Sequence, residues 1–321
     1  MRTAPATGVT VSSGSLAATF LPELGLLGVS LRHRGDELLA LPGGLDGYRA
    51  GKVTGLPLLA PWANRLGARG YEVEGVAVDL EGLDLPTDDN GLPIHGTMTA
   101  QPGWEVAAAG DGRSFAARFD LGARPDLLAS FPFPHELRIE VAVDAPDAPG
   151  HAGGAAVLSV ATTLTPTSRR AVPVAFGFHP YFLLPGVPRR DVRLRLPARR
   201  HLALDDRQLP TGATSPRPAE DNPVGERTFD DLYALGDDRE LALTGGGRRL
   251  RLLVGDGYRY AQVFTPPPAL AEAVCLEPMT APGNALVAGG YELAAPGTSF
   301  TARFQLRLEE APPGAVPVGE A

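Results

Sequence analysis

The stretch LRIEVAV (residues 137–143) places an apolar residue at every second position and a charged or small residue between them. Successive side chains of a β-strand point to opposite faces, so this period of two predicts a strand with one face in a core and one in water. The same largely alternating pattern recurs over residues 9–12, 71–79, 157–164 and 300–308. Each of these segments is expected to form a strand.

Turn residues separate the predicted strands. Glycine combined with aspartate, asparagine or further glycine stands at 35–36, 88–91, 110–112, 245–247 and 255–257, where a positive φ costs little. No convincing amphipathic helix of ten or more residues is found, so the sequence predicts an all-β protein, a large antiparallel β-sandwich. We expect a single domain over residues 1–310, a long hairpin loop at 144–154 and a disordered tail at 311–321.

Composition and charge exclude some classes of partner. The chain has 321 residues and a net charge of −8, with a pI near 5.3, whereas nucleic-acid binding needs a cationic surface. Of the 29 basic residues only Lys52 is a lysine. Such a bias fits genome base composition, so arginine clusters are weak evidence for an anion site. The arginine-rich run at 189–200 is interpreted as a strand with a solvated arginine face.

Location and metal binding are predicted from what the pattern lacks. Cys275 is the single cysteine, which excludes an intramolecular disulfide and fits a reducing compartment. We find no signal-peptide pattern and no run of 18 apolar residues, so a cytoplasmic protein without a membrane partner is expected, as a monomer or homodimer. Four histidines share no metal-ligand spacing with an acid or cysteine: His33, His135, His151 and His201.

Two titratable residues share an unusual context. His179, in FGFHPYF (176–182), and Glu277, in VCLEP (274–278), each follow an apolar run and each precede a proline. Proline confines the residue before it to extended backbone, so both side chains are expected to be held stiffly at a strand end. A histidine and a buried glutamate can act as general acid and base near pH 7. The pattern alone favours a structural alternative, in which the histidine bonds a backbone carbonyl and the glutamate pairs with an arginine.

Five segments together resemble, in order, the signatures of the aldose 1-epimerase, or galactose mutarotase, family. They are PLLAPWANRL (57–66), PIHGTMTAQPGWEV (93–106), FPFPHELRIEVAV (131–143), PVAFGFHPYFLLPG (173–186) and VCLEPMTAPGNAL (274–286). With strand-like sequence on both sides, the resemblance covers nearly the whole chain. It implies a galactose mutarotase-like β-sandwich with an open sugar-binding cleft, and an isomerase that acts on a hexose such as glucose or galactose.

The resemblance also implies roles for single residues. Glu277 takes the proton from the anomeric hydroxyl, and His179 protonates the ring oxygen, so that the ring opens, the C1–C2 bond rotates and the ring closes to the other anomer. The implied sugar-binding residues are His95, Arg65, Asn64 and an aspartate of FDDLY (229–233), with Asp230 the first choice and Asp231 the second. Neither a cofactor nor a metal is implied. The candidates for an aromatic platform under the sugar are Trp62, Trp104, Phe178 and Tyr181.

One departure from the resembled pattern bears on the substrate. After the HG pair the family commonly continues with an aromatic residue and then an arginine, whereas this chain has TMTAQ (97–101). Three alternatives to a free-hexose epimerase stay open. They are a hexose-phosphate 1-epimerase, a non-catalytic carbohydrate-binding sandwich, and a glycosidase that uses Asp230 and Glu277 as carboxylates about 5–10 Å apart.

Overall fold

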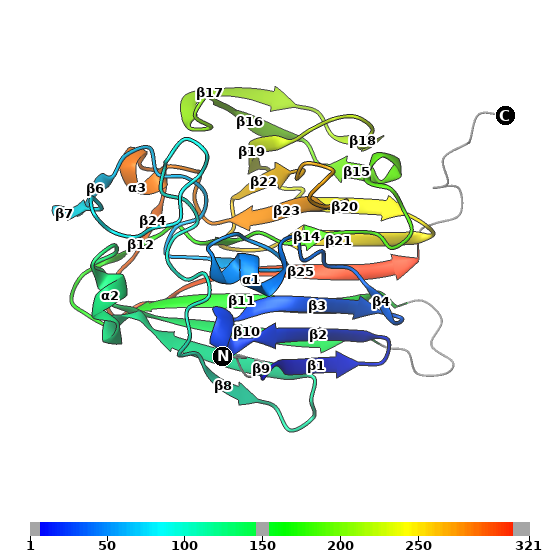
Figure 1. The fold of residues 1–321 in the computed structure, drawn as a ribbon, viewed down its shortest axis with the longest axis horizontal. Helices are drawn as coiled ribbons and strands as arrows, with labels where there is room; N and C mark the ends of the chain where they lie inside the picture. Colours follow the sequence, from blue (N-terminus) through cyan, green and yellow to red (C-terminus); the bar gives the residue numbers. More distant parts are fainter. Residues whose placement is uncertain (1–6, 146–153, 311–321) are drawn as a thin grey trace.

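Two layers of β-sheet make up most of the computed structural model, which describes residues 7–145 and 154–310 (Figure 1). The first layer is a nine-stranded sheet. In sheet order its strands are β18 (Glu220–Pro223), β15 (Arg193–Leu196), β20 (Glu240–Gly245), β21 (Arg248–Val254), β25 (Phe300–Glu310), β11 (Ala156–Pro166), β10 (His135–Asp144), β9 (Ser114–Asp120) and β8 (Glu105–Ala108). Its neighbouring strands pair antiparallel, as in the long β10–β11 hairpin.

The second layer contains an eight-stranded and a four-stranded sheet. The larger one is ordered β17 (Pro210–Arg217), β16 (Arg199–Leu204), β19 (Asp230–Leu235), β22 (Tyr260–Phe264), β23 (Val274–Met279), β13 (Gly177–Phe178) and β5 (Leu58–Leu59), and β14 (Tyr181–Phe182) also pairs with β23. The smaller one is ordered β1 (Val9–Ser13), β2 (Leu16–Leu21), β3 (Leu27–His33) and β4 (Asp36–Glu37). The bridges Gly28–Leu56 and Leu39–Phe182 connect the two sheets.

Short elements complete the fold. Two small two-stranded sheets are formed, one by the hairpin of β6 (Gly70–Val73) with β7 (Val76–Asp79), and one by β12 (Val172–Val174) with β24 (Glu292–Ala294). The helical segments are α1 (Gly44–Arg49), α2 (Pro125–Leu128), α3 (Ala285–Ala288) and the single 3-10 turns η1 (Pro22–Leu24), η2 (Leu121–Ala123) and η3 (Arg189–Asp191). In the described ranges, none of the helices is long and apolar enough to cross a membrane.

The main core lies between the two layers. It joins apolar residues of both, as where Phe178 of β13 meets Phe304 of β25 edge to face at a centroid distance of 5.2 Å. Leu276 and Val263 of the eight-stranded sheet point into this core. Their neighbour Glu277 therefore belongs to the opposite face of that sheet. This outer face, which two smaller apolar clusters partly cover, carries the candidate site.

The predicted all-β, antiparallel fold is confirmed, with three local corrections. Residues 71–79 form a hairpin, β6–β7, because Glu74 and Gly75 take positive φ values of 50° and 72°. The run 189–200 does contain strand β15, but two of its arginines, Arg189 and Arg199, are buried and not solvated. The guanidinium of Arg189 donates to the carbonyl oxygen of Pro266, and that of Arg199 donates to those of Pro197 and Pro218. Glu277 does not end its strand, because β23 continues through Met279. Most of the predicted loop at 144–154 and the tail lie outside the described residues.

Candidate active site

His179 and Glu277 lie side by side on the outer face of the eight-stranded sheet. The distance between His179 Nε2 and Glu277 Oε1 is 3.2 Å, and the two residues are only 5% and 2% exposed. In the part of the chain that the structure describes, Glu277 Oε1 has no well-aligned hydrogen-bond donor, and His179 Nδ1 has no hydrogen-bond partner. The pair is thus close enough to share a proton, yet it retains unused hydrogen-bonding capacity.

An interruption in one strand ladder brings the pair together. On one side of β23, β14 pairs with Val274 and Cys275 and β13 pairs with Met279. His179 and Pro180 form the break between β13 and β14 and lie opposite the unpaired part of β23. Pro278 is tolerated inside β23 because no ladder hydrogen bond is required at this break. The two X-Pro pairs seen in the sequence therefore face each other across one gap in the sheet.

Arg65 is held in place by a network of acidic and amide side chains. Its Nε donates to Asp88 Oδ2 at 2.7 Å, and its Nη2 lies 3.4 Å from Asp230 Oδ2. Asn64 Oδ1 accepts from the Arg65 backbone N–H at 2.9 Å and from Nη1 at 3.2 Å. Gln262 donates to Asp230 Oδ1 at 2.6 Å. Because both carboxylates accept from it, the guanidinium has a fixed orientation.

His95 approaches the pair from a tightly bound loop. Its ring packs edge to face on that of His179, with a centroid distance of 5.4 Å, and its backbone N–H donates to Asn64 C=O at 3.0 Å. His95 and Asn64 both take positive φ values, 63° and 61°, a sparsely populated conformation that clusters at functional sites.

Gly96 is the residue that allows this loop to lie against the chain at Ala60. Its φ is +70°, and a Cβ there would lie 2.1 Å from Ala60 O. We expect Gly96→Ala to lower the free energy of unfolding by about 3 kcal/mol or more, because the clash adds to the strain of a left-handed alanine. Urea unfolding measures this loss. In the matched control Gly91→Ala, φ is +74° but the Cβ meets nothing within 4 Å, so only about 1 kcal/mol should be lost; equal losses would contradict the explanation.

Burial dominates the electrostatics of the site. It raises the pKa of Glu277 well above its ordinary value of 4.5, and nearby Asp230 raises it further. Burial lowers the pKa of His179 well below 6.5, and the positive charge of Arg65 adds to this effect. The pKa of His95 falls for the same two reasons, with His179 as a further cause. Since burial disfavours both charged forms, the site favours states in which charge is balanced.

The structure distinguishes the two aspartates of FDDLY. Asp230 points to the outer face, where it meets Arg65 and Gln262. Asp231 points to the opposite face, where its Oδ1 lies 3.0 Å from His201 Nε2. Asp230 is therefore the aspartate that shares the outer face with Glu277.

Only one of the four aromatic candidates lies beside His179 and Glu277. Tyr181 stacks on His179 with a centroid distance of 4.8 Å and an angle of 7°. The three others, Trp62, Trp104 and Phe178, are part of the main core. The fully buried Cys275 shares the face of Glu277, and burial raises its pKa well above the ordinary value of 9.0, which keeps the thiol protonated.

Two residues of the site were not predicted from the sequence. The sequence indicates only a turn at residues 88–91, yet Asp88 both closes that turn, by accepting from the backbone N–H of Asn90 and Leu92, and binds Arg65. Gln262 is the cross-strand neighbour of Glu277. The signal that could have indicated it is a polar side chain inside the apolar strand YAQVF (260–264).

Comparisons with solved structures agree on the fold. The structure is similar to that of a galactose mutarotase-like protein from Clostridium acetobutylicum, with a TM-score of 0.78, 18% identity, and 94% and 95% of the two chains covered. It is also similar to galactose 1-epimerase from Lactobacillus acidophilus NCFM, with a TM-score of 0.73, 15% identity and 94% of each chain covered. No curated protein matches the sequence.

The family assignment comes from the sequence itself. A family model described as aldose 1-epimerase matches residues 23–307. This range contains all five signature segments and every residue of the network around His179 and Glu277. The chain therefore belongs to the aldose 1-epimerase family.

Proposed function

We propose that the protein is an aldose 1-epimerase that interconverts the α and β anomers of a free hexose. The observation that carries the proposal is the buried pair of His179 Nε2 and Glu277 Oε1, 3.2 Å apart, in a member of this family. A base and an acid held this close can act on the two oxygens bonded to one anomeric carbon.

The reaction needs one proton removed and one delivered. The Glu277 carboxylate takes the proton of the anomeric hydroxyl while the His179 imidazolium gives its proton to the ring oxygen. The bond between C1 and the ring oxygen breaks, and the aldehyde C=O forms. After rotation about C1–C2, Glu277 returns a proton to the aldehyde oxygen, and His179 takes one from the attacking hydroxyl. The enzyme ends in its starting protonation state.

The two protonation states of the pair carry the same total charge. Carboxylate with imidazolium is the state that opens the ring, and carboxylic acid with neutral imidazole is the state that closes it. Burial raises the pKa of Glu277 and lowers that of His179, which favours the neutral state. The short distance between the two groups, 3.2 Å, acts in the opposite direction, because an opposite charge nearby favours the charged form of each group. A pair whose two states carry the same total charge suits a reaction that runs through both.

The surrounding side chains are suited to hold a hexose. Arg65 and His95 are placed to donate hydrogen bonds to sugar oxygens, and Asp230 is placed to accept from two hydroxyls. Asn64 acts through Arg65, because its side-chain oxygen already accepts from that residue twice. The cation of Arg65 is balanced by two carboxylates, Asp88 and Asp230. This balance supports a neutral hexose over a hexose phosphate, whose dianion needs uncompensated positive charge.

A direct rate measurement tests the proposed function. Freshly dissolved α-D-glucose and α-D-galactose are followed by polarimetry or NMR with and without the protein. We expect the approach to anomeric equilibrium to accelerate in proportion to protein concentration. Binding of these sugars without any acceleration would instead indicate a non-catalytic carbohydrate-binding protein, and release of the leaving group from aryl glycosides would indicate a glycosidase.

The pH dependence follows from the two shifted pKa values. Activity requires that the pair hold one proton. Adding a second proton to the pair should occur well below pH 6.5, because burial lowers the pKa of His179. Removing the last proton should occur well above pH 4.5, because burial raises the pKa of Glu277. We expect kcat/KM, which reports the free enzyme, to fall by less than about twofold when the pH is lowered from 7 to 5.5.

The control for this measurement is the uncatalysed reaction, which itself depends on pH and is subtracted at each pH. A solvent-exposed histidine with its ordinary pKa would give a different profile, with about a fivefold loss between pH 6.5 and pH 5.5. An acid limb at pH 6.5 would therefore show that the proton-transferring histidine is not buried as His179 is.

A further inference from the structure

One face of the His179 ring lies flat against Tyr181. The two ring centroids are 4.8 Å apart, and the planes are only 7° from parallel. The other ring contacts among the described residues are edge to face or tilted. The face of an aromatic ring carries partial negative charge and attracts a cation above it. The stack therefore distinguishes the two protonation states of His179, because only the imidazolium gains this attraction.

The sheet, and not the histidine, holds Tyr181 in place. Its backbone N–H donates to Gly55 C=O at 2.8 Å, and its own C=O accepts from the N–H of Ala40 at 2.9 Å. Strand β14, to which it belongs, pairs with β23. Pro180 stands between the two stacked residues and confines the backbone of His179 to extended geometry. The ring of Tyr181 is thus a fixed surface on which the imidazole lies.

Most other surroundings disfavour a positive charge on His179. Burial lowers its pKa well below 6.5, and the cation of Arg65 adds to this effect. His95, which packs edge to face on the ring at 5.4 Å, is itself kept neutral by burial, which lowers its pKa. His179 Nδ1 has no hydrogen-bond acceptor among the described residues. Besides Glu277, whose Oε1 lies 3.2 Å from Nε2, the face of Tyr181 is the group placed to stabilise the imidazolium.

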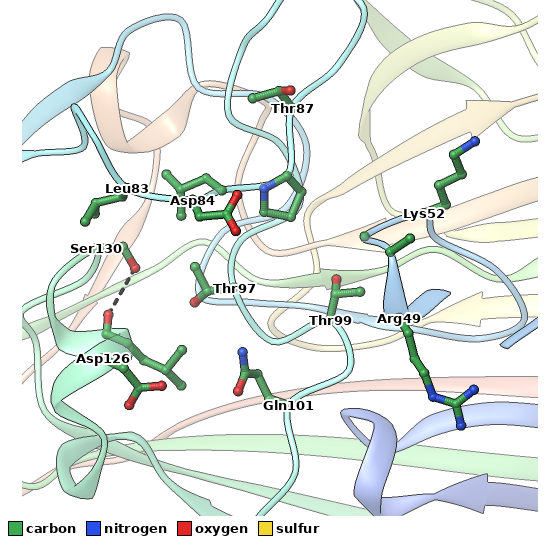
Figure 2. A pocket seen from close by; sticks show the side chains of 15 residues that line it. Arg49, Lys52, Leu83, Asp84, Thr87, Thr97, Thr99, Gln101, Asp126 and Ser130 are labelled. Atoms are coloured by element: carbon green, nitrogen blue, oxygen red, sulfur yellow. Dashed lines mark hydrogen bonds between the residues drawn. The ribbon is translucent and has the colours of Figure 1, made fainter. Parts of the chain in front are cut away.

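Exclusion of water strengthens the attraction between a cation and a ring face. His179 and Tyr181 are only 5% and 4% exposed, and Phe264 packs on His179 from a further side, edge to face at 5.8 Å. The cavity shown in Figure 2 has a volume of about 740 Å³, but neither His179 nor Tyr181 lines it. This cavity therefore does not open onto the stack, and the contact between the two rings is dry.

We propose that Tyr181 is a positioning residue for the proton transfer, whose ring face orients the imidazole of His179 and stabilises the positive charge that it carries while it protonates the sugar. The proposal rests on the proposed function, in which the imidazolium is the acid. The neutral imidazole has no net charge to stabilise, whereas in the transition state the ring keeps part of a positive charge, so the stack lowers the barrier. This role differs from the sugar platform expected from the sequence, because His179 covers one face of Tyr181.

Fluorinated phenylalanines at position 181 test the proposal with little change in the shape of the site. Each fluorine withdraws electrons from the ring face and so weakens its attraction for a cation. Phenylalanine and its 4-fluoro, 3,5-difluoro and 3,4,5-trifluoro derivatives replace Tyr181, and polarimetry measures kcat for α-D-galactose. We expect log kcat to fall in step with the number of fluorines, to about threefold below Tyr181→Phe for the trifluoro derivative. KM should change by less than about twofold, because the stack does not contact the sugar.

Two ordinary substitutions bracket the fluorine series. Tyr181→Phe keeps the ring face, so its kcat should stay within about twofold of that of the unsubstituted protein. Tyr181→Leu removes the face but keeps an apolar side chain, and kcat should fall by about tenfold, as expected for a desolvated cation that loses its ring. Urea unfolding shows whether the smaller side chain also costs stability. If the leucine variant does not fold, the fluorinated variants still decide the question.

Phe178 provides the matched control for fluorination. It directly precedes His179 in the chain, but its ring lies in the main core, where it packs on Phe304. Trifluorophenylalanine at position 178 should therefore leave kcat unchanged. A kcat that stays constant across the series at position 181, or an equal fall when the fluorines are at position 178, would overturn the proposal.

Failure of the proposed function gives a different result. In that case the protein accelerates no anomerisation with any residue at position 181, and ¹⁵N NMR at pH 7 follows the charge of His179 directly. The signals of this imidazole are identified by their loss in His179→Gln. If the ring face stabilises the cation, fluorination at position 181 moves these signals toward the shifts of neutral imidazole. Signals that stay in place would reject the stack as a source of that stabilisation.

Discussion

Glu277→Gln is expected to lower the acceleration of α-D-glucose and α-D-galactose anomerisation by about 10²–10⁴-fold. The amide has nearly the shape of the carboxylate but no useful affinity for a proton. Because Glu277 is 2% exposed, water cannot readily replace it as the base. Polarimetry at saturating sugar measures the loss in kcat, which is where a group that acts in the transition state should appear.

The same variant should leave the fold and sugar binding intact. Its side chain keeps the volume of the original, so urea unfolding should change little, and calorimetry should show a similar affinity for galactose. Glu140→Gln is a matched control, because that glutamate lies on the solvent side of β10 and pairs with Arg138, at 2.7 Å. Undiminished acceleration by Glu277→Gln would reject the assignment of the base, whereas equal losses in both variants would indicate a general effect on stability.

The sandwich was predictable because its long strands have one wet and one dry face. β10 and β11 alternate buried and partly exposed residues over their full length, so a period of two was visible in the sequence. β23 has no such alternation, since all six of its residues are buried. Its sequence therefore could not indicate which residues face the main core and which face the site, or where the strand ends.

The candidate site was predictable only where a local signal marked it. His179 and Glu277 stand before prolines, and the proline pattern reflects the gap in the ladder between β13 and β14. Asp88 and Gln262 carry no such mark, because their role depends on contacts with residues far away in the sequence: Asp88 with Arg65, 23 positions away, and Gln262 with Asp230, 32 positions away. Choosing Asp230 over Asp231 likewise required the strand register, since neighbouring residues differ only in the face they occupy.

His179→Gln is expected to cause a loss of similar size, about 10²–10⁴-fold in kcat. Glutamine can still donate a hydrogen bond toward the ring oxygen, but it cannot deliver a proton. The ring of Tyr181, which stacks on His179 at 4.8 Å, and the apolar surroundings should keep the substituted side chain in place. Polarimetry measures the rate, and the affinity for galactose is checked by calorimetry as for the glutamate variant.

The double variant Glu277→Gln with His179→Gln then tests whether the two residues act as one unit. Ring opening needs a proton removed and a proton delivered in the same event, so either single variant already forces water to supply the missing partner. We therefore expect the double variant to be no more than about threefold slower than the worse single variant, the strong non-additivity seen when residues act together. Multiplied losses would mean that each residue contributes alone, and the 3.2 Å contact between Nε2 and Oε1 would then have no catalytic meaning.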